Sequence, residues 1–435
     1  MSVQLFDWQE PLAARIREIL TKGDVAILAT GTGTGKSYMS MDVARQLSLR
    51  PLIIAPKASL TNWGRVASSM GVSLGGVINP ERISLGKCQW YDGTNWNLDG
   101  IGLVIFDEVH RGCSGMESKA TLALARLKKY PTKKLLMSAT ICDDPMKLRG
   151  IGYLLGFHSY DKAGFYRWAT TRGVFLNRYL PRPCYMFTRS KKEAVKYMTQ
   201  IHEDIGDRMV CAKMSDIPNF PETFITAKLV DLEAEDAEEV RKAYGEMDPK
   251  LKEAPTNSLV RDTRGRQRSE FAKCGYLADA VEDHLAEGKS VVVFLCYRES
   301  LARLAGKLRG KGIDDFREIH GGNTPGDRQL ALDEFQSNKN RVMLAMIQAG
   351  GISVDMHDIH HQRQRVSLIT PGFNSSELKQ AFGRVHRAGG TASIQQLILA
   401  AKTIEERVYD KVSGKLQNIS AANGELTDED LIGNS

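Results

Sequence analysis

The sequence predicts an α/β protein made of two tandem lobes, each built on a parallel sheet, with a basic helical insertion. Short apolar runs with strand character alternate with stretches of helical spacing from residue 25 to residue 155, and this alternation returns from residue 289 onward. The chain has 435 residues, which is enough for two or three domains. Charged segments separate the two alternating regions and mark them as distinct lobes.

The composition is that of a globular protein, with 42% hydrophobic and 26% charged residues. We expect a first lobe over residues 1–142, a basic helical elaboration over 143–230, a charged helical linker over 231–285, a second lobe over 286–415 and a C-terminal tail over 416–435. No apolar run approaches the ~18 residues of a membrane span, and the N-terminus lacks a signal-like pattern. We therefore expect an intracellular, cytoplasmic protein with no membrane partner.

The cysteines do not suggest a cross-linked or metal-stabilised protein. There are seven of them, widely spaced and without a CxxC pair. This spacing argues against a zinc site and against a disulfide framework.

A glycine- and threonine-rich stretch over residues 29–37 follows the strand-like run Val25–Ala29 and precedes a helix-like run over residues 38–49. Glycines let a backbone wrap closely around phosphates, and the free N–H groups of a helix start attract their negative charge. We therefore predict a phosphate loop for ATP made of Thr32, Gly33, Thr34, Gly35, Lys36 and Ser37, in which the Ser37 hydroxyl would bind magnesium. Thr30 stands where the strict pattern has glycine, and the alternative is a turn that binds nothing.

The segments around this loop offer further candidates. Residues Asp7–Leu20 have the spacing of a helix capped by Asp7, and the Gln9 amide can pair with an adenine edge, although a surface glutamine is the simpler alternative. A strand over Leu52–Ala55 precedes Lys57 and Ser59, which could meet a nucleic-acid backbone because strand ends face the ligand crevice of a parallel sheet.

The apolar strand over residues 103–106 ends in Asp107, Glu108, Val109 and His110. We predict that Asp107 holds magnesium and that Glu108 orients and deprotonates the attacking water, with His110 linking the site to a neighbouring element. The alternative for two adjacent acids alone is an ordinary acidic loop. A third strand runs into the hydroxyl residues Ser138 and Thr140, which can bond the acidic motif and relay its state or can form a plain turn.

These three motifs resemble those of superfamily-two helicase motors. The residues around them, notably 54–57 and Asn62 with Trp63, are most similar to Swi/Snf-type remodelling ATPases and annealing helicases. The resemblance implies two RecA-like lobes that hydrolyse ATP with Mg²⁺ and act on nucleic acid. Trp63 itself is predicted to be a packing residue.

Residues 145–200 are strongly basic, with eleven lysines and arginines against two acids. This surplus favours a phosphate-backbone partner, and we take Arg167, Arg172 and Lys191 as candidate DNA contacts; a solvated basic face is the alternative. Aromatic residues are interleaved with these cations. Stacking on bases would suit them, but the core of a small helical elaboration is the favoured interpretation.

The second lobe carries its candidates after predicted strands. The strand over 341–347 leads into Gln348, a candidate DNA contact, and Gly351, where the backbone can approach ATP closely. Asp355 can accept from a ribose hydroxyl. Arg384 and Arg387 follow a strand over 366–369 and are three residues apart, so on a helix they would share a face and could bind one anion; a basic surface helix is the alternative.

The resemblance favours anion binding by these two arginines over a basic surface helix. Residues 320–322, 349–351, 383–387 and 403–406 are similar in order and spacing to the second lobe of Swi/Snf-type motors, which implies that Arg384 and Arg387 act as arginine fingers and that Gln380 belongs to the coupling motif. The similarity spans residues 5–415. Ser138–Thr140 and Gly390 depart from the remodeller pattern and favour a compact motor on bare or branched DNA, like small phage-type branch-migrating helicases.

We therefore expect an ATP-dependent DNA helicase or translocase that remodels forked or branched DNA by branch migration, fork reversal or annealing. For a phage protein the compartment would be the host cytoplasm. Three alternatives stay open: a motor that tracks duplex without separating strands, a slow ATP-gated nucleic-acid clamp, and, as a lesser possibility, RNA as the substrate. The sequence assigns no protein partner.

Overall fold

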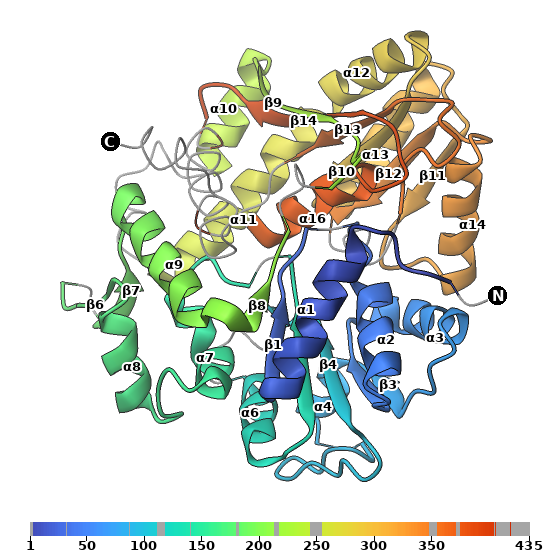
Figure 1. Cartoon of the computed structure of the whole chain (residues 1–435). Coiled ribbons are helices and arrows are strands. Elements are labelled where there is room, and N and C mark those ends of the chain that lie inside the picture. The colour runs from blue at the N-terminus through green and yellow to red at the C-terminus, as the bar shows by residue number, and fades with distance from the viewer. Residues whose placement is uncertain are drawn as a thin grey trace. The chain divides into compact units, whose positions relative to one another are not determined.

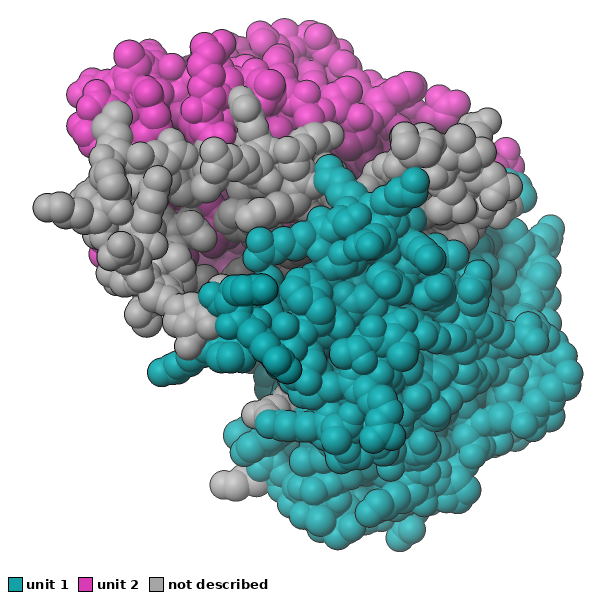
Figure 2. All heavy atoms as spheres, turned by 90° about the vertical axis from the view of Figure 1, so that its left-hand side faces the viewer, with its two compact units in different colours: residues 1–218, 414–435 teal, residues 219–413 magenta. Residues whose placement is uncertain are grey.

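The protein folds into two compact units, residues 1–218 with 414–435 and residues 219–413 (Figure 2). The structure is a computed structural model that describes residues 3–31, 33–86, 88–110, 118–139, 141–179, 182–212, 217–243, 255–347, 355–370 and 375–403, together with residues 405 and 418. Among these residues, no helix has both the length and the apolar character needed to cross a membrane.

The first unit is organised around a six-stranded sheet in which every neighbouring pair is parallel (Figure 1). In spatial order the strands are β3 (Gly76–Ile78), β2 (Pro51–Ile54), β4 (Leu103–Asp107), β5 (Lys133–Met137), β1 (Val25–Leu28) and β8 (Met209–Val210). Parallel strands all end at one edge of a sheet. The ends of β4, β5 and β1, which carry the three sequence motifs, are therefore neighbours.

Helices cover both faces of this sheet, and the apolar strands serve both layers. Along β4, Leu103 and Ile105 pack against one layer, whereas Val104 and Phe106 pack against the other. The first layer contains α1 (Gln9–Lys22), α2 (Lys36–Gln46) and α3 (Leu60–Ser69). The second contains α4 (Pro80–Ser84), α6 (Lys119–Arg126), α7 (Arg149–Leu155) and α9 (Lys191–Ile205).

The start of α1 differs from the prediction. The helix begins at Gln9, and the residue before it, Trp8, has helical backbone angles and no side-chain cap. The backbone amides of Gln9 and Glu10 instead donate to the carbonyl of Phe6. This turn supplies partners for two N–H groups that Asp7 was predicted to cap.

Between β5 and β8 the chain forms short elements that extend the first unit. They are the 3₁₀ helix η3 (Pro145–Leu148), α7, α8 (Lys162–Thr170), the antiparallel pair β6 (Val174–Asn177) and β7 (Cys184–Phe187), α9 and η4 (Gly206–Arg208). Two more 3₁₀ helices described by the structure lie earlier, η1 (Lys57–Ser59) and η2 (Leu127–Lys129). Within residues 143–230, which are predicted to form one basic helical elaboration, α7 and α9 pack on the first sheet and β8 extends it.

The second unit contains another six-stranded, fully parallel sheet. Its strands, in spatial order, are β11 (Phe316–Ile319), β12 (Val342–Met346), β10 (Ser290–Leu295), β13 (Arg365–Ile369), β14 (Ser393–Ala400) and β9 (Thr223–Val230). The helices are α10 (Ala234–Ala243), α11 (Pro255–Ala272), α12 (Cys274–Ala286), α13 (Arg298–Gly310), α14 (Pro325–Gln336) and α16 (Ser375–Val385). The predicted α/β fold with two RecA-like parallel-sheet lobes is confirmed.

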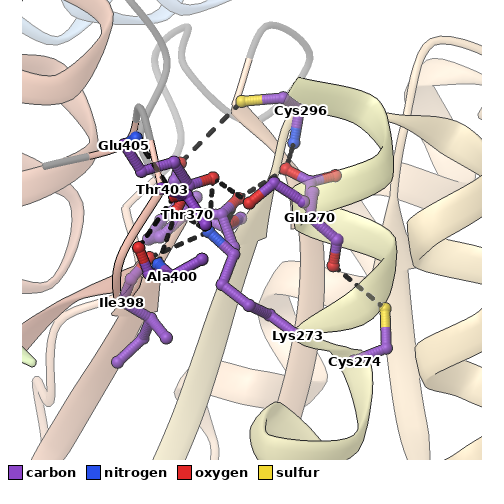
Figure 3. A network of polar contacts seen from close by, with 11 residues as sticks. Glu270, Lys273, Cys274, Cys296, Thr370, Ile398, Ala400, Thr403 and Glu405 are labelled. Carbon is purple, nitrogen blue, oxygen red and sulfur yellow. Dashed lines mark hydrogen bonds and ion pairs between the residues drawn. The ribbon is translucent and has the colours of Figure 1, made fainter. Parts of the chain in front are cut away.

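One buried ion pair fastens the junction of α11 and α12 to the segment that follows β14. The Lys273 Nζ lies 2.7 Å from Glu405 Oε2, and both side chains are almost fully buried. Lys273 also donates to the carbonyl of Ile398, while the Glu405 carboxylate accepts from Ser269 Oγ and the backbone amide of Ala400 (Figure 3). Because each charge also has several polar partners, the cost of burying the pair is largely offset.

A second buried carboxylate, Glu270, lies in the last turn of α11, three residues before Lys273. It accepts from the backbone amides of Cys296 and Tyr297, at 2.7 and 2.9 Å, and from the Thr370 hydroxyl at 2.5 Å (Figure 3). Burial raises its pKa, and the three hydrogen bonds act in the opposite direction. Glu270 thereby ties α11 to the loops that follow β10 and β13, at the sheet edge where the predicted second-lobe motifs begin.

We predict that Glu405→Ala lowers the free energy of local opening of β14 by about 3–5 kcal/mol. The substitution leaves Lys273 charged and buried without its partner. Hydrogen exchange of the β14 amides measures this free energy. Asp231→Ala is the matched control, since it removes an exposed ion pair with Lys402 in the same unit and should cost less than about 1 kcal/mol.

All five tryptophans lie in the first unit. Their fluorescence therefore checks that Glu405→Ala leaves that unit folded. Equal protection of β14 in the two variants would contradict the role of this ion pair.

Candidate nucleotide-binding site

The predicted phosphate loop connects β1 to α2 and depends on two glycines with left-handed backbone. Gly33 and Gly35 have φ values of 80° and 75°, a region in which a side chain is strained. At Gly35 a Cβ would also lie 2.3 Å from Gln9 Nε2. Glycine at position 35 is therefore required both by the turn and by the close approach of α1.

The Lys36 ammonium is held inside the loop. Its Nζ donates to the carbonyls of Thr30 and Gly31 at 2.9 and 2.6 Å. The Thr34 hydroxyl also donates to Gly31 and lies 2.8 Å from the Thr30 hydroxyl, which is fully buried. Thr30, the departure from the strict glycine pattern, therefore contributes a hydrogen bond that closes the loop.

Gln9 is a structural neighbour of the loop. It is buried, its Nε2 donates to the Thr34 carbonyl at 2.9 Å, and its Oε1 accepts from the Phe6 amide at 3.0 Å. Arg17 fastens the same helix to α2 by an ion pair to the buried Asp42, and it also pairs with Glu10 within α1. The position of α1 thus bears directly on the shape of the phosphate loop.

The two acids at the end of β4 lie in different surroundings. Asp107 Oδ2 accepts from the Trp63 indole Nε1 at 2.9 Å. Burial and the nearby Glu108 charge raise the pKa of Asp107 to about 6, although Trp63 and the positive charge of Lys36 act in the opposite direction. Glu108 has a φ of 52°, a conformation that is strained for a residue with a side chain.

A line of contacts leads from the acids to β5 and β1. His110 Nδ1 lies 3.2 Å from Glu108 Oε2 and 2.7 Å from the Ser138 hydroxyl. The backbone amide of Ser138 donates to the carbonyl of Leu28, the last residue of β1. The acidic motif, Ser138 and the strand that enters the phosphate loop are thus joined by successive short contacts.

Magnesium suits the donors at this edge. Asp107 offers a carboxylate and Ser37, which is partly exposed in the first turn of α2, offers a hydroxyl. Oxygen ligands from one or two side chains are typical of Mg²⁺, which keeps several waters and binds substrate phosphates. No cluster of three or more His, Cys, Asp or Glu side chains that could hold a metal occurs within the described ranges.

In the second unit, the two predicted arginine fingers have different environments. Arg384 lies on α16 with only 4% of its surface exposed. The helix ends at Val385, so Arg387 is not on its face; its Nε turns back to the Gly383 carbonyl, and its Nη1 pairs with Asp355 Oδ1 at 2.8 Å. Burial and the Arg387 charge lower the pKa of the adjacent His357 to about 4.

Gln380 also lies on α16 and is buried. Four further candidates, Thr32, Thr140, Gln348 and Gly351, lie outside the described residues.

The candidate nucleic-acid contacts divide by exposure and pairing. Lys57, Arg167 and Lys191 are exposed. Ser59 is buried and donates to the carbonyl of Pro56, which argues against its predicted contact with a backbone phosphate. Arg172 forms a two-bond ion pair with Asp204 on α9, at 2.8 and 2.9 Å, so its charge is already compensated.

Comparison with known proteins identifies the chemistry. Residues 272–389 match the family of the helicase conserved C-terminal domain. A protein of Acanthamoeba polyphaga mimivirus, assigned as an ATP-dependent RNA helicase, is 27% identical over 99% of this chain and 85% of its own length. The chain is an ATP-hydrolysing helicase, and its motifs are similar to those of superfamily two.

Two further relatives of this helicase are similar over shorter stretches. CHROMATIN REMODELING 24 of Arabidopsis thaliana is 26% identical over 34% of the chain, and the ATP-dependent helicase MG018 of Mycoplasma genitalium is 28% identical over 35%. In each case the match covers 14% of the relative's own length. The helicase assignment implies ATP and a nucleic acid as its ligands.

Sequence reasoning missed the second role of Trp63. The prediction that it packs is confirmed, since it is 1% exposed, but its N–H also fixes the Asp107 carboxylate. Nothing in the sequence pairs these residues, which are 44 positions apart. Only the neighbouring ends of β2 and β4 bring them together.

We predict that Trp63→Phe lowers ATP turnover by about 10- to 100-fold, because the partner that orients the carboxylate predicted to bind magnesium is removed. Steady-state phosphate release at saturating nucleic acid measures the effect. Trp96→Phe is the matched control: it also deletes a buried indole hydrogen bond, to the Ala123 carbonyl, at a place remote from the acids. Equal losses in both variants would assign Trp63 to stability alone.

Proposed function

We propose that this helicase couples ATP hydrolysis to movement on DNA and remodels forked or branched DNA, in the manner of Swi/Snf-type and small phage branch-migrating motors. The observation that carries this proposal is the meeting of the phosphate loop and the Asp107–Glu108 pair at one sheet edge, where Lys36 is close enough to influence the pKa of Asp107. Such an arrangement is suited to a nucleoside triphosphate and its metal.

Each residue of the first unit then has a distinct task. Lys36 exchanges its bonds to two loop carbonyls for the phosphate oxygens, and the amides at the start of α2 bind the same oxygens. Ser37 and Asp107 would hold Mg²⁺, which supplies neutralisation of phosphate charge. Glu108 orients the attacking water and accepts its proton. His110 and Ser138 transmit the state of the acids to β5.

In the second unit we propose that Arg384 and Arg387 stabilise negative charge on the transferred phosphate. The Asp355 carboxylate pairs with Arg387 until the phosphate takes its place. Once Arg387 has left, the Asp355 carboxylate can accept a hydrogen bond from the ribose. This exchange of one anion for another would make the engagement of Arg387 depend on bound nucleotide.

DNA is favoured as the partner by the similarity to Swi/Snf-type motors and to the Arabidopsis relative named for chromatin remodelling. The exposed cations of residues 167–196 would bind its phosphates. RNA is the second candidate because the mimivirus relative, which aligns with nearly the whole chain, is assigned as an RNA helicase.

We expect Lys36→Ala and Glu108→Gln to reduce nucleic-acid-stimulated ATP hydrolysis to background, because they remove the phosphate cation and the base. The measurement is the ATPase rate of the wild type and both variants with single-stranded, duplex, forked and four-way DNA, and with matched RNA. Maximal stimulation by forked or four-way DNA supports the proposal. If only RNA stimulates hydrolysis, the substrate is RNA and not DNA. Unchanged turnover in the variants would refute the assignment of the nucleotide site.

We expect Arg387→Ala to bind ATP nearly as the wild type does and to lose hydrolysis by about 10³-fold or more. Equilibrium binding of a fluorescent nucleotide and single-turnover hydrolysis separate the two effects. Asp355→Asn is the companion variant, because it releases the arginine without removing it. Loss of nucleotide binding in Arg387→Ala would contradict the finger role.

A further inference from the structure

The β6–β7 hairpin is mounted firmly on the first unit. Its two strands are paired along their whole length, starting with Val174 and Phe187 at the base of the hairpin. Helix α8 packs beside β6 (Figure 1). Val174 is buried with Phe165 in a small core, and the rings of Tyr166 and Tyr185 stack with centroids 3.7 Å apart. The base of the hairpin is therefore a fixed support.

The outer half of the hairpin has the opposite character. Phe175 and Leu176 are 43% and 36% exposed, and Tyr179 is 100% exposed. The Tyr179 amide donates to Asn177 Oδ1 at 3.0 Å, which links this residue to the end of β6. A fully exposed aromatic ring beside a hairpin whose base is packed is available for an external ligand.

Cations are frequent near Tyr179 in the sequence. Arg178 and Arg182 flank it in the turn, and Arg189, Lys191 and Lys192 follow at the base, all exposed. None of the five has an ion pair with a described residue, whereas Arg172 of the same region is paired with Asp204. The available charge is thus concentrated on the hairpin and on the start of α9, and it suits a polyanion.

We propose that the β6–β7 hairpin binds an unpaired nucleotide, with Tyr179 stacked on its base and Arg178 and Arg182 on the adjacent phosphates. This inference rests on the proposed action on nucleic acid and adds a preference for single strands. Stacking on an aromatic ring is tolerant of sequence because every base has a π-face. A base inside a duplex has both faces covered, so the hairpin recognises strands that are already open or are opening.

The test is equilibrium binding of the full chain, without nucleotide, to a fluorescein-labelled single strand of DNA, the same strand in RNA, and a blunt duplex of equal length. Tyr179→Ala should bind the single strands about 5- to 100-fold more weakly and the duplex within about twofold. Tyr179→Trp should retain wild-type affinity because it restores a stacking ring. Phe224→Ala, which removes another exposed ring, is the matched control.

The cations have their own readout. Arg178→Gln with Arg182→Gln should lower the slope of log affinity against log salt by about 1.4 for the single strand. Wild-type affinity of Tyr179→Ala for single strands, an equal loss on duplex, or no single-strand binding by the wild type would each overturn the proposal. A defect that appears only with a protein partner would reassign the hairpin to protein docking. Binding is read without hydrolysis, so failure of the motor function would appear separately, in the ATPase comparison.

Discussion

The parallel arrangement of the first sheet is the constraint on which the candidate site depends. β4, β5 and β1 are neighbours, and parallel neighbours must end at the same edge. The phosphate loop, the two acids and Ser138 come from sequence positions separated by about a hundred residues, yet each has only to follow its own strand to arrive beside the others. Apolar packing on both faces of these strands holds that edge in place.

Electrostatic balance at the edge is the second requirement. Lys36 brings a positive charge into a partly buried loop and is accepted by two carbonyls, while Asp107 and Glu108 bring like charges together. Burial and the neighbouring Glu108 charge raise the pKa of Asp107, whereas Trp63 and the positive charge of Lys36 act in the opposite direction. A bound cation and a polyphosphate together would satisfy both halves of the site, which is why we regard it as prepared for such a ligand.

Much of the fold could be predicted because buried parallel strands appear as continuous apolar runs, as in residues 103–106 and 291–295. β8 was not predicted because it has only two residues. β9 was not predicted because six of its eight residues are exposed at a sheet edge. Motifs that are contiguous in sequence could be predicted because all their residues lie within a few positions of one another. Contacts between distant positions, such as Glu270 with Thr370 or Arg172 with Asp204, follow from tertiary packing and leave no local pattern.

The chain enters the second unit near residue 219 and returns to the first after residue 413. Asn418, beyond the return, donates from its Nδ2 to the Asp143 carbonyl of the first unit. The second unit is therefore inserted within the first and is connected to it by the chain at both ends. Two covalent crossings restrict free swivelling between the units, so any rearrangement during turnover must be accommodated at both crossings at once.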